Sequence, residues 1–168
     1  MEPGARSLDV QESLPLVDVH SLDVASPPEQ VWRALLNVIR GFRANRAASV
    51  AATALGCGDR RSTGPFPAVE SSMPGFHLVR STAPEEMTLE GEHRFARYRL
   101  TFRIQDLGPA GSRLHAESRA EFPGPVGTLY RALVVGSGGH VIAVRQILRL
   151  VARTARRTTT STADGSTR

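Results

Sequence analysis

The chain has 168 residues, of which 40% are hydrophobic and 22% charged, with a formal net charge of +5 and a pI near 10.8. These values are typical of one ordinary soluble globular domain, which at this length buries roughly 70% of the surface of its unfolded chain. We expect no membrane-spanning segment, because the uncharged apolar runs are much shorter than the roughly 18 residues needed to cross a bilayer. Internal disulfides are excluded because Cys57 is the single cysteine.

The basic residues do not indicate a nucleic-acid partner. All 21 are arginine and none is lysine, which is typical of a GC-rich coding sequence. They are spread along the chain among 16 acidic residues, whereas nucleic-acid binders gather basic and aromatic residues on one face. Most of them are expected to form a solvated surface. Docking to an acidic partner is the alternative for Arg97, Arg99, Arg103 and the arginines from 145 to 157.

The ends of the sequence predict where the domain lies and in which compartment. The first residues, MEPGARSLDVQESLPL, contain acids and lack the apolar core of a secretory signal. A single cysteine also fits a reducing compartment, so we expect a cytoplasmic protein. Residues 1–14 and the polar tail over 157–168 lack an apolar stripe and are expected to be disordered. One domain over residues 15–156 remains.

The start of this domain predicts a strand followed by two helices. Residues Leu16–Val24 form the strand candidate, and Ser26 is placed to cap a helix whose first turn holds two prolines and Glu29. A second, alanine-rich helix is predicted over Arg46–Leu55, ending at Gly56. The apolar residues that keep helical spacing in the first helix are Val31, Leu35, Val38, Ile39 and Phe42.

A long loop and four strands are predicted next. Residues 58–75 are rich in Pro, Gly and Ser and predict the loop. The strands are expected over residues 76–83, 86–92, 94–105 and 112–122, at spacings that suit hairpins. Alternation is strict in the last two, so one face packs and the other is wet. Arginines on one wet face and glutamates on the next predict cross-strand ion pairs, each contributing well under about 1 kcal/mol.

The last apolar stretch, residues 126–155, predicts an amphipathic helix of about 30 residues, roughly 45 Å long. Its own propensity does not fix so long a helix, so it needs the apolar face of the sheet. Glycines at 136, 138 and 139 interrupt it, which predicts either a kink or a turn between two helices. A dinucleotide-binding loop is not indicated, because the third glycine of that motif is missing and no βαβ unit follows.

Two segments carry a resemblance to a known family. SLDVASPPEQVWRALL at the start and EFPGPVGTLYRALV before the last helix, with the strands between them, resemble the START-like polyketide cyclase/dehydrase (SRPBCC) superfamily. The resemblance covers roughly residues 16–155 and implies the helix-grip fold, an α+β fold in which a curved antiparallel sheet wraps around a long C-terminal helix. Members have six or seven strands where about five are visible here, so two short strands are expected within residues 58–75.

The resemblance also implies an apolar cavity between sheet and helix, because members hold lipids, polyketides or hormones and a minority are cyclases. The expected lining residues are Leu100, Phe102, Ala116, Ser118, Ala120, Leu133, Gly136 and Val144, with Tyr98 and His140 as polar anchors. A lone histidine on an apolar stripe is more often a core residue, but in a cavity His140 is able to orient a carbonyl or act as a general acid or base. The small side chains of the last strand either let the helix come close or leave a hollow.

Three hypotheses of function follow. The first is the binding of an apolar or aromatic small molecule, the second is a cyclase or dehydratase that uses His140 or Tyr98 as acid and base, and the third is an interaction protein with a filled core. A cavity in which His140 meets a second titratable group favours the enzyme. We expect a monomer or homodimer without cofactor or metal, because the other histidines lack metal-ligand spacing.

Overall fold

The computed structural model of the chain describes residues 14–134 and 136–163. Disorder was expected over positions 1–14 and 157–168, of which residues 1–13 and 164–168 lie outside these described residues. The described strands are β1 (Leu16–Val24), β2 (Ser72–Met73), β3 (Phe76–Thr82), β4 (Glu86–His93), β5 (Ala96–Asp106) and β6 (Ser112–Glu121). The described helices are α2 (Pro28–Arg43), α3 (Arg46–Leu55), α4 (Gly124–Val134) and α5 (Gly139–Ala163), with a 3₁₀ turn η1 (Gly108–Ala110).

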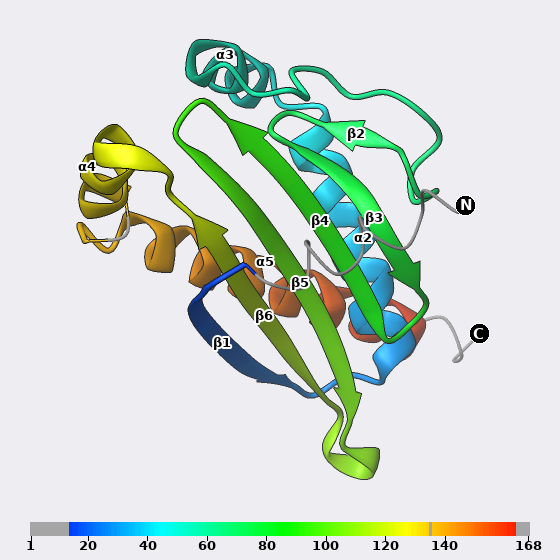
Figure 1. Ribbon diagram of the computed structural model, residues 1–168. Helices are drawn as coiled ribbons and strands as arrows, with labels where there is room; N and C mark the ends of the chain where they lie inside the picture. The colour runs from blue at the N-terminus through cyan, green and yellow to red at the C-terminus, as the bar shows by residue number, and fades with distance from the viewer. Residues whose placement is uncertain (1–13, 135, 164–168) are drawn as a thin grey trace, which may run out of the picture.

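The strands form one antiparallel sheet in the order β1-β6-β5-β4-β3-β2, so the first strand pairs with the last (Figure 1). Helices α2 and α5 lie on the same face of the curved sheet, where they contact each other, and α5 also packs against β1. This arrangement confirms the α+β helix-grip fold with a long C-terminal helix on the sheet. The two shorter helices after the first strand are confirmed as well.

The core lies between the two helices and the inner face of the sheet. Its central buried residues are Val31, Leu35 and Ile39 of α2, Val144, Leu148 and Val151 of α5, and Leu89, Phe102 and Leu114 of the sheet. Three- and four-residue spacing brings the helical members onto one stripe of each helix. Burying each such side chain contributes about 1.5–3 kcal/mol, so the two-helix layer is a main source of stability.

The outer face of the sheet carries the predicted cross-strand ion pairs. Arg103 of β5 contacts Glu86 at 2.9 Å and Glu117 at 3.1 Å, and Arg113 of β6 contacts Asp23 of β1 at 2.6 Å. Hydrogen bonds from Arg119 and Arg103 lower the pKa of the Glu117 carboxyl. Every arginine of β5 and β6 has an acidic partner: Arg97, Arg99, Arg103, Arg113 and Arg119.

The helix ends differ from prediction at one position. Ser26 does not cap α2, because the N-cap position is occupied by Pro27, whose side chain makes no capping bond. Ser26 is buried, and its carbonyl accepts a hydrogen bond from the Ser112 hydroxyl at 2.7 Å. It therefore joins the start of α2 to β6. The second helix begins and ends as predicted: Asn45 caps α3 through bonds to two backbone N–H groups, and Gly56 ends it in the left-handed conformation, at φ 72°.

Within residues 58–75 the structure has one short strand, β2, where two were expected. β2 pairs with β3 at the sheet edge and extends by a bridge between Thr63 and Ser72. The rest of the loop is tied to the end of α2, since Arg43 donates to the carbonyls of Thr63 and Gly64. These bonds hold the loop as an irregular edge, which is why it forms no second strand.

The C-terminal segment consists of two helices instead of one. α4 ends at Val134 and α5 begins at Gly139, with Gly138 in the left-handed region at φ 74°. Of the two alternatives for the glycines, the turn between helices is observed. α5 continues to Ala163, past the expected start of the tail at residue 157. The expected domain limits, residues 15–156, stay a prediction.

Because Gly91 of β4 has no side chain, the Tyr98 ring and the carbonyl group of Gly75 come very close to its backbone. Gly91 lies opposite Tyr98 of β5, whose ring crosses over it. A Cβ at this position would overlap the carbonyl oxygen of Gly75 and come within 2.6 Å of the Tyr98 ring. Glycine is therefore required for the Tyr98 ring to reach the β2–β3 turn.

We predict that Gly91→Ala lowers the free energy of unfolding by about 1–3 kcal/mol, the usual cost of overpacking, in urea denaturation. Gly41→Ala is the control, since a Cβ at Gly41 in α2 meets open space. It should raise the free energy of unfolding by about 0.5 kcal/mol, because alanine favours the helix. Equal stability of Gly91→Ala and the unchanged chain would contradict this packing.

Candidate ligand-binding site

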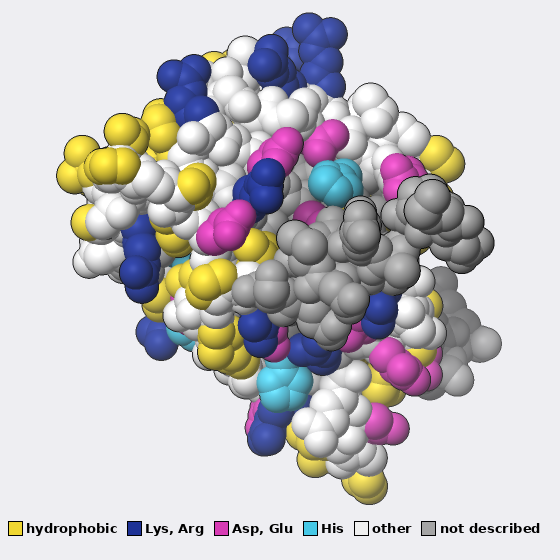
Figure 2. Space-filling model, in the orientation of Figure 1, with side chains coloured by type: hydrophobic (Ala, Val, Ile, Leu, Met, Phe, Trp, Pro, Cys, Tyr) yellow, Lys and Arg dark blue, Asp and Glu magenta, His cyan; other side chains and the backbone are white. Residues whose placement is uncertain are grey.

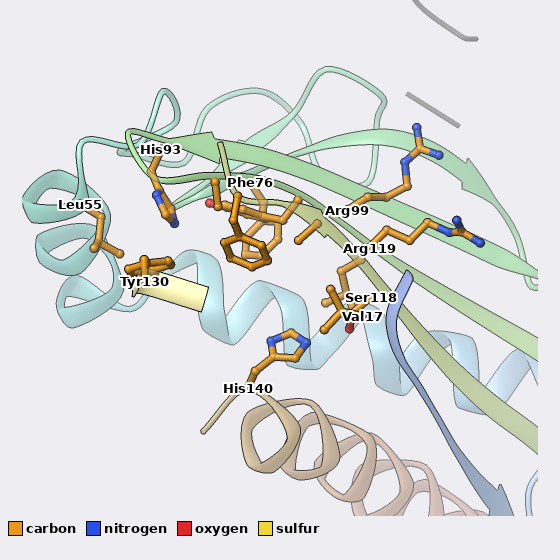
Figure 3. A pocket seen from close by; sticks show the side chains of 14 residues that line it. Val17, Leu55, Phe76, His93, Arg99, Ser118, Arg119, Tyr130 and His140 are labelled. Atoms are coloured by element: carbon orange, nitrogen blue, oxygen red, sulfur yellow. The ribbon is translucent and has the colours of Figure 1, made fainter. Parts of the chain in front are cut away.

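A cavity of about 230 Å³ lies on the inner face of the sheet, between β5, β6 and the side chains of Tyr130 from α4 and His140 from α5 (Figure 3). Its lining residues are Val17, Leu55, Phe76, His93, Ala96, Tyr98, Arg99, Leu100, Ser118, Arg119, Ala120, Phe122, Tyr130 and His140. Arg99 and Arg119 line it close to the backbone, because Figure 3 shows their side chains pointing away from it. The remaining surface is mostly apolar.

Small residues on the sheet create the hollow. Ala96, Ser118 and Ala120 occupy inward positions of β5 and β6, where larger side chains would fill the space. α5 begins at Gly139, so it covers only the edge of this region. The small residues of β6 thus have both of the roles considered: Ala116 is fully buried in the core, and Ser118 and Ala120 face the cavity.

Five of the sequence-predicted lining residues meet in the cavity: Tyr98, Leu100, Ser118, Ala120 and His140. Five others do not line it. Phe102, Ala116 and Val144 are buried in the core between α2, α5 and the sheet. Leu133 and Gly136 lie outside the cavity on the exposed side of the chain around the break after α4, where Leu133 is 69% exposed. Tyr130 takes its place facing the sheet (Figure 3).

Aromatic residues form one wall, in which the predicted Tyr98 is joined by Phe76, His93 and Tyr130, which the sequence analysis did not place there. The ring of Tyr130 lies 4.9 Å from that of His93, and the rings of Phe76 and Tyr98 lie 5.0 Å apart, both edge to face. Such pairs contribute about 0.5–1.5 kcal/mol beyond burial. The signal that could have found Tyr130 is its position in EFPGPVGTLYRALV, where it is the one aromatic residue of an apolar helix.

The titratable side chains of this wall are held in their uncharged forms. The Tyr98 hydroxyl donates to the carbonyl of Gly75 at 2.7 Å, and burial, with a smaller contribution from Cys57, raises the Tyr98 pKa far above its usual value. Burial also raises the pKa of Tyr130 and lowers that of His93. The Nδ1 atom of His93 accepts a hydrogen bond from the backbone N–H of Phe95 at 3.1 Å. This wall therefore favours uncharged, ring-shaped guests.

The opposite end of the cavity is polar. Asp18 of β1 lies between two histidines, with its Oδ2 atom 3.3 Å from His20 Nε2 and its Oδ1 atom 3.6 Å from His140 Nε2. Alternation along β1 places Asp18 and His20 on the inner face with Val24, and a bulge after Leu16 adds Val17 to the cavity wall. His140 points from the start of α5 towards the sheet (Figure 3).

This end has unused hydrogen-bonding capacity. The Ser118 hydroxyl belongs to a residue that is 4% exposed, and within the described residues it has no hydrogen-bond partner. The facing atoms of Asp18 and His140 are buried and likewise lack hydrogen bonds there. Leaving a buried polar group unpaired costs about 1–3 kcal/mol, so such groups in a native protein usually serve a ligand or water.

Asp18 and His140 lie side by side at this end. The 3.6 Å between Asp18 Oδ1 and His140 Nε2 is within ion-pair range but too long for a hydrogen bond. Among residues 14–134 and 136–163, no group of three or more His, Cys, Asp or Glu side chains has a geometry that could hold a metal ion.

Comparison with known proteins supports the fold. No protein-family model and no curated protein matches the chain. A structure from Mesorhizobium loti is similar over 84% of this chain and 97% of its own, with a TM-score of 0.54 and 16% identity. Structures from Rhizobium leguminosarum (TM-score 0.53, 13% identity) and Nitrosospira multiformis (0.52, 16%) cover 83% and 81% of this chain and each 93% of their own. At these identities the similarity concerns the fold alone. Within the described part of the chain, no helix combines the length and apolarity needed to span a bilayer.

The raised pKa of Tyr98 predicts a loss of stability in alkali. The folded state holds the phenol proton above the ordinary pKa of 10.0, whereas the unfolded state releases it. Stability from this group is therefore complete below about pH 10 and falls as the pH rises further. Absorbance at the phenolate band should show Tyr98 ionising only as the protein unfolds. Tyr98→Phe should flatten the alkaline loss of stability; an unchanged profile would contradict the assignment.

Proposed function

We propose that the protein binds a small aromatic molecule in this cavity, with its ring against the aromatic wall and a polar group at Ser118 and His140. The observation that carries the proposal is an apolar hollow that ends in a buried hydroxyl without a partner. The resemblance to the START-like superfamily supports it, because members of that superfamily hold apolar guests in the same part of the fold. A mostly apolar pocket beside the core favours a guest-binding role over a role in which the protein only docks to partners.

The volume of the cavity limits the guest. About 230 Å³ exceeds the roughly 150 Å³ that accepts benzene in an engineered apolar cavity and is below the roughly 300–1,000 Å³ of drug-sized sites. One or two fused rings fit within this space, whereas a long acyl chain or a multi-ring polyketide would extend out of it into solvent. The sequence led us to expect a lipid- or polyketide-like guest, and the cavity volume narrows this expectation to a molecule of one or two fused rings.

Apolar burial and the polar groups have separate roles. Removing about 300 Å² of apolar surface from water gains roughly 7 kcal/mol, which corresponds to a dissociation constant near 10 µM before the cost of association. A hydrogen bond to Ser118 adds only about 0.5–1.5 kcal/mol. The wall thus supplies most of the affinity, and the polar end orients the guest.

We predict that 2-naphthol binds more tightly than naphthalene in calorimetric titration, because its hydroxyl reaches the polar end. Ser118→Ala should remove this difference of roughly 3- to 10-fold. Ala120→Leu should abolish binding by filling the hollow. Ala143→Leu, the same change at an exposed position of α5, is the control. The proposal fails if no ring compound binds or if Ala120→Leu binds as well as the unchanged protein.

A second candidate function is acid–base catalysis by His140, as in a cyclase or dehydratase. The position of Asp18, 3.6 Å from His140 Nε2, favours it, because catalytic hydrogen bonds are often long in the ligand-free protein and shorten when a substrate binds. Tyr98 is a poorer candidate, because its hydroxyl already donates to Gly75 and its pKa is raised far above neutrality.

For any substrate that the protein turns over, we predict that His140→Ala lowers kcat by about 10²–10⁴-fold, the usual contribution of a general acid or base. Asp18→Asn should lower kcat less and leave KM nearly unchanged, because Asp18 orients His140 without touching the guest. His115→Ala, on the outer face of the sheet beside Ser21, should have no effect. Equal turnover by His140→Ala and the unchanged protein would remove this candidate.

A further inference from the structure

Positive charge is segregated onto the C-terminal helices. Residues 124–163 contain no acidic residue. The arginines of this segment are Arg131, Arg145, Arg149, Arg153, Arg156 and Arg157. The arginines of β5 and β6, by contrast, are neutralised by acids on neighbouring strands. Helices α4 and α5 therefore carry six positive charges and no negative charge of their own.

The same helices expose large aliphatic side chains. Val126, Leu129 and Leu133 recur along one face of α4, and Leu129 is 71% exposed. Ile142 and Leu150 of α5 are also exposed. Figure 2 shows a group of hydrophobic side chains at the α4 corner of the molecule. Each of these side chains keeps at least half of its surface exposed, so they are available to an external partner.

On α5 the aliphatic and basic residues share one strip. At 100° per residue, Ile142, Arg149 and Arg153 point in nearly the same direction, opposite the buried Leu148 and Val151. The exposed surface of α4 and α5 therefore alternates aliphatic side chains with arginines and has no acid of its own. We name it the helical surface.

Three partners can be compared for the helical surface: a second copy of the chain, a nucleic acid and an anionic lipid bilayer. A second copy of the chain would place identical surfaces face to face across a two-fold axis and would bring the arginines of both copies together, with no acid on either α4 or α5. Nucleic-acid binders use aromatic and polar groups where this surface has leucine and isoleucine. Anionic lipid bilayers attract basic residues and accept aliphatic ones at the headgroup boundary.

We propose that the helical surface docks on an anionic lipid bilayer, with Leu129 and Leu133 inserted at the headgroup boundary and the arginines of α5 over anionic headgroups. Docking on this side leaves the ion-paired outer face of the sheet in solvent. The inference goes beyond guest binding and does not depend on it.

Co-sedimentation with vesicles tests the proposal. The protein should bind vesicles of phosphatidylcholine with phosphatidylglycerol, should not bind phosphatidylcholine alone, and should dissociate at high salt. Leu129→Ser with Leu133→Ser should lower the partition coefficient at least tenfold. Arg149→Gln with Arg153→Gln should lower it by roughly 10- to 30-fold. All four positions are exposed, so the variants should keep the unfolding curve of the unchanged protein.

Matched controls lie at the opposite edge of the sheet. Val69→Ser and Arg80→Gln, both at exposed positions, should bind vesicles like the unchanged protein. The proposal is overturned if anionic vesicles do not bind at low salt, or if the controls lose binding as the helical variants do. It is also overturned if sedimentation velocity shows a dimer that Leu129→Ser with Leu133→Ser dissociates, or if duplex DNA binds and only the arginine variants weaken it.

Discussion

The packing of α2 and α5 over the inner face of the sheet is the constraint on which the rest of the structure depends. Neither helix is stable alone, because each has an apolar stripe that water disfavours. The sheet in turn has an inner face that needs cover. Val31 and Leu35 of α2 meet Val144 and Leu148 of α5 over Phe102, and this contact fixes the height of both helices above the strands.

The cavity follows from where that packing stops. α5 starts at Gly139, and α4 turns aside at the glycine break, so the far ends of β5 and β6 lie under helix ends instead of a helix face. Small residues at Ser118 and Ala120 deepen the gap, and Tyr130 closes it from α4. His140 and Asp18 lie at the margin of the apolar core, where polar side chains cost less than they would at its centre. A fold that is closely packed in one half thus has an open site in the other.

Most of the fold was readable from the sequence, because strict alternation and helical spacing are local properties. The strand Leu16–Val24, the helix Arg46–Leu55 and the glycine interruption were predicted where they occur. Of the ten lining residues predicted from the sequence, five line the cavity. Leu133 was predicted inside the cavity because the apolar spacing was applied to one straight helix. The segment forms two helices, and on α4 the side chain of Leu133 is exposed. Asp18 was missed because its meeting with His140 joins residues far apart in the chain, which no spacing rule shows.

The pairing of the first strand with the last has a consequence for biosynthesis. β1 leaves the ribosome early, yet its partner β6 begins only at Ser112, and the helix that covers both comes later still. During translation the apolar stripe of α2 therefore stays uncovered and β1 keeps an unpaired edge. Such non-local contacts slow folding and expose aggregation-prone surface. The nascent chain thus becomes a stable domain only when its final helix has emerged, which makes chaperone protection of the N-terminal third valuable.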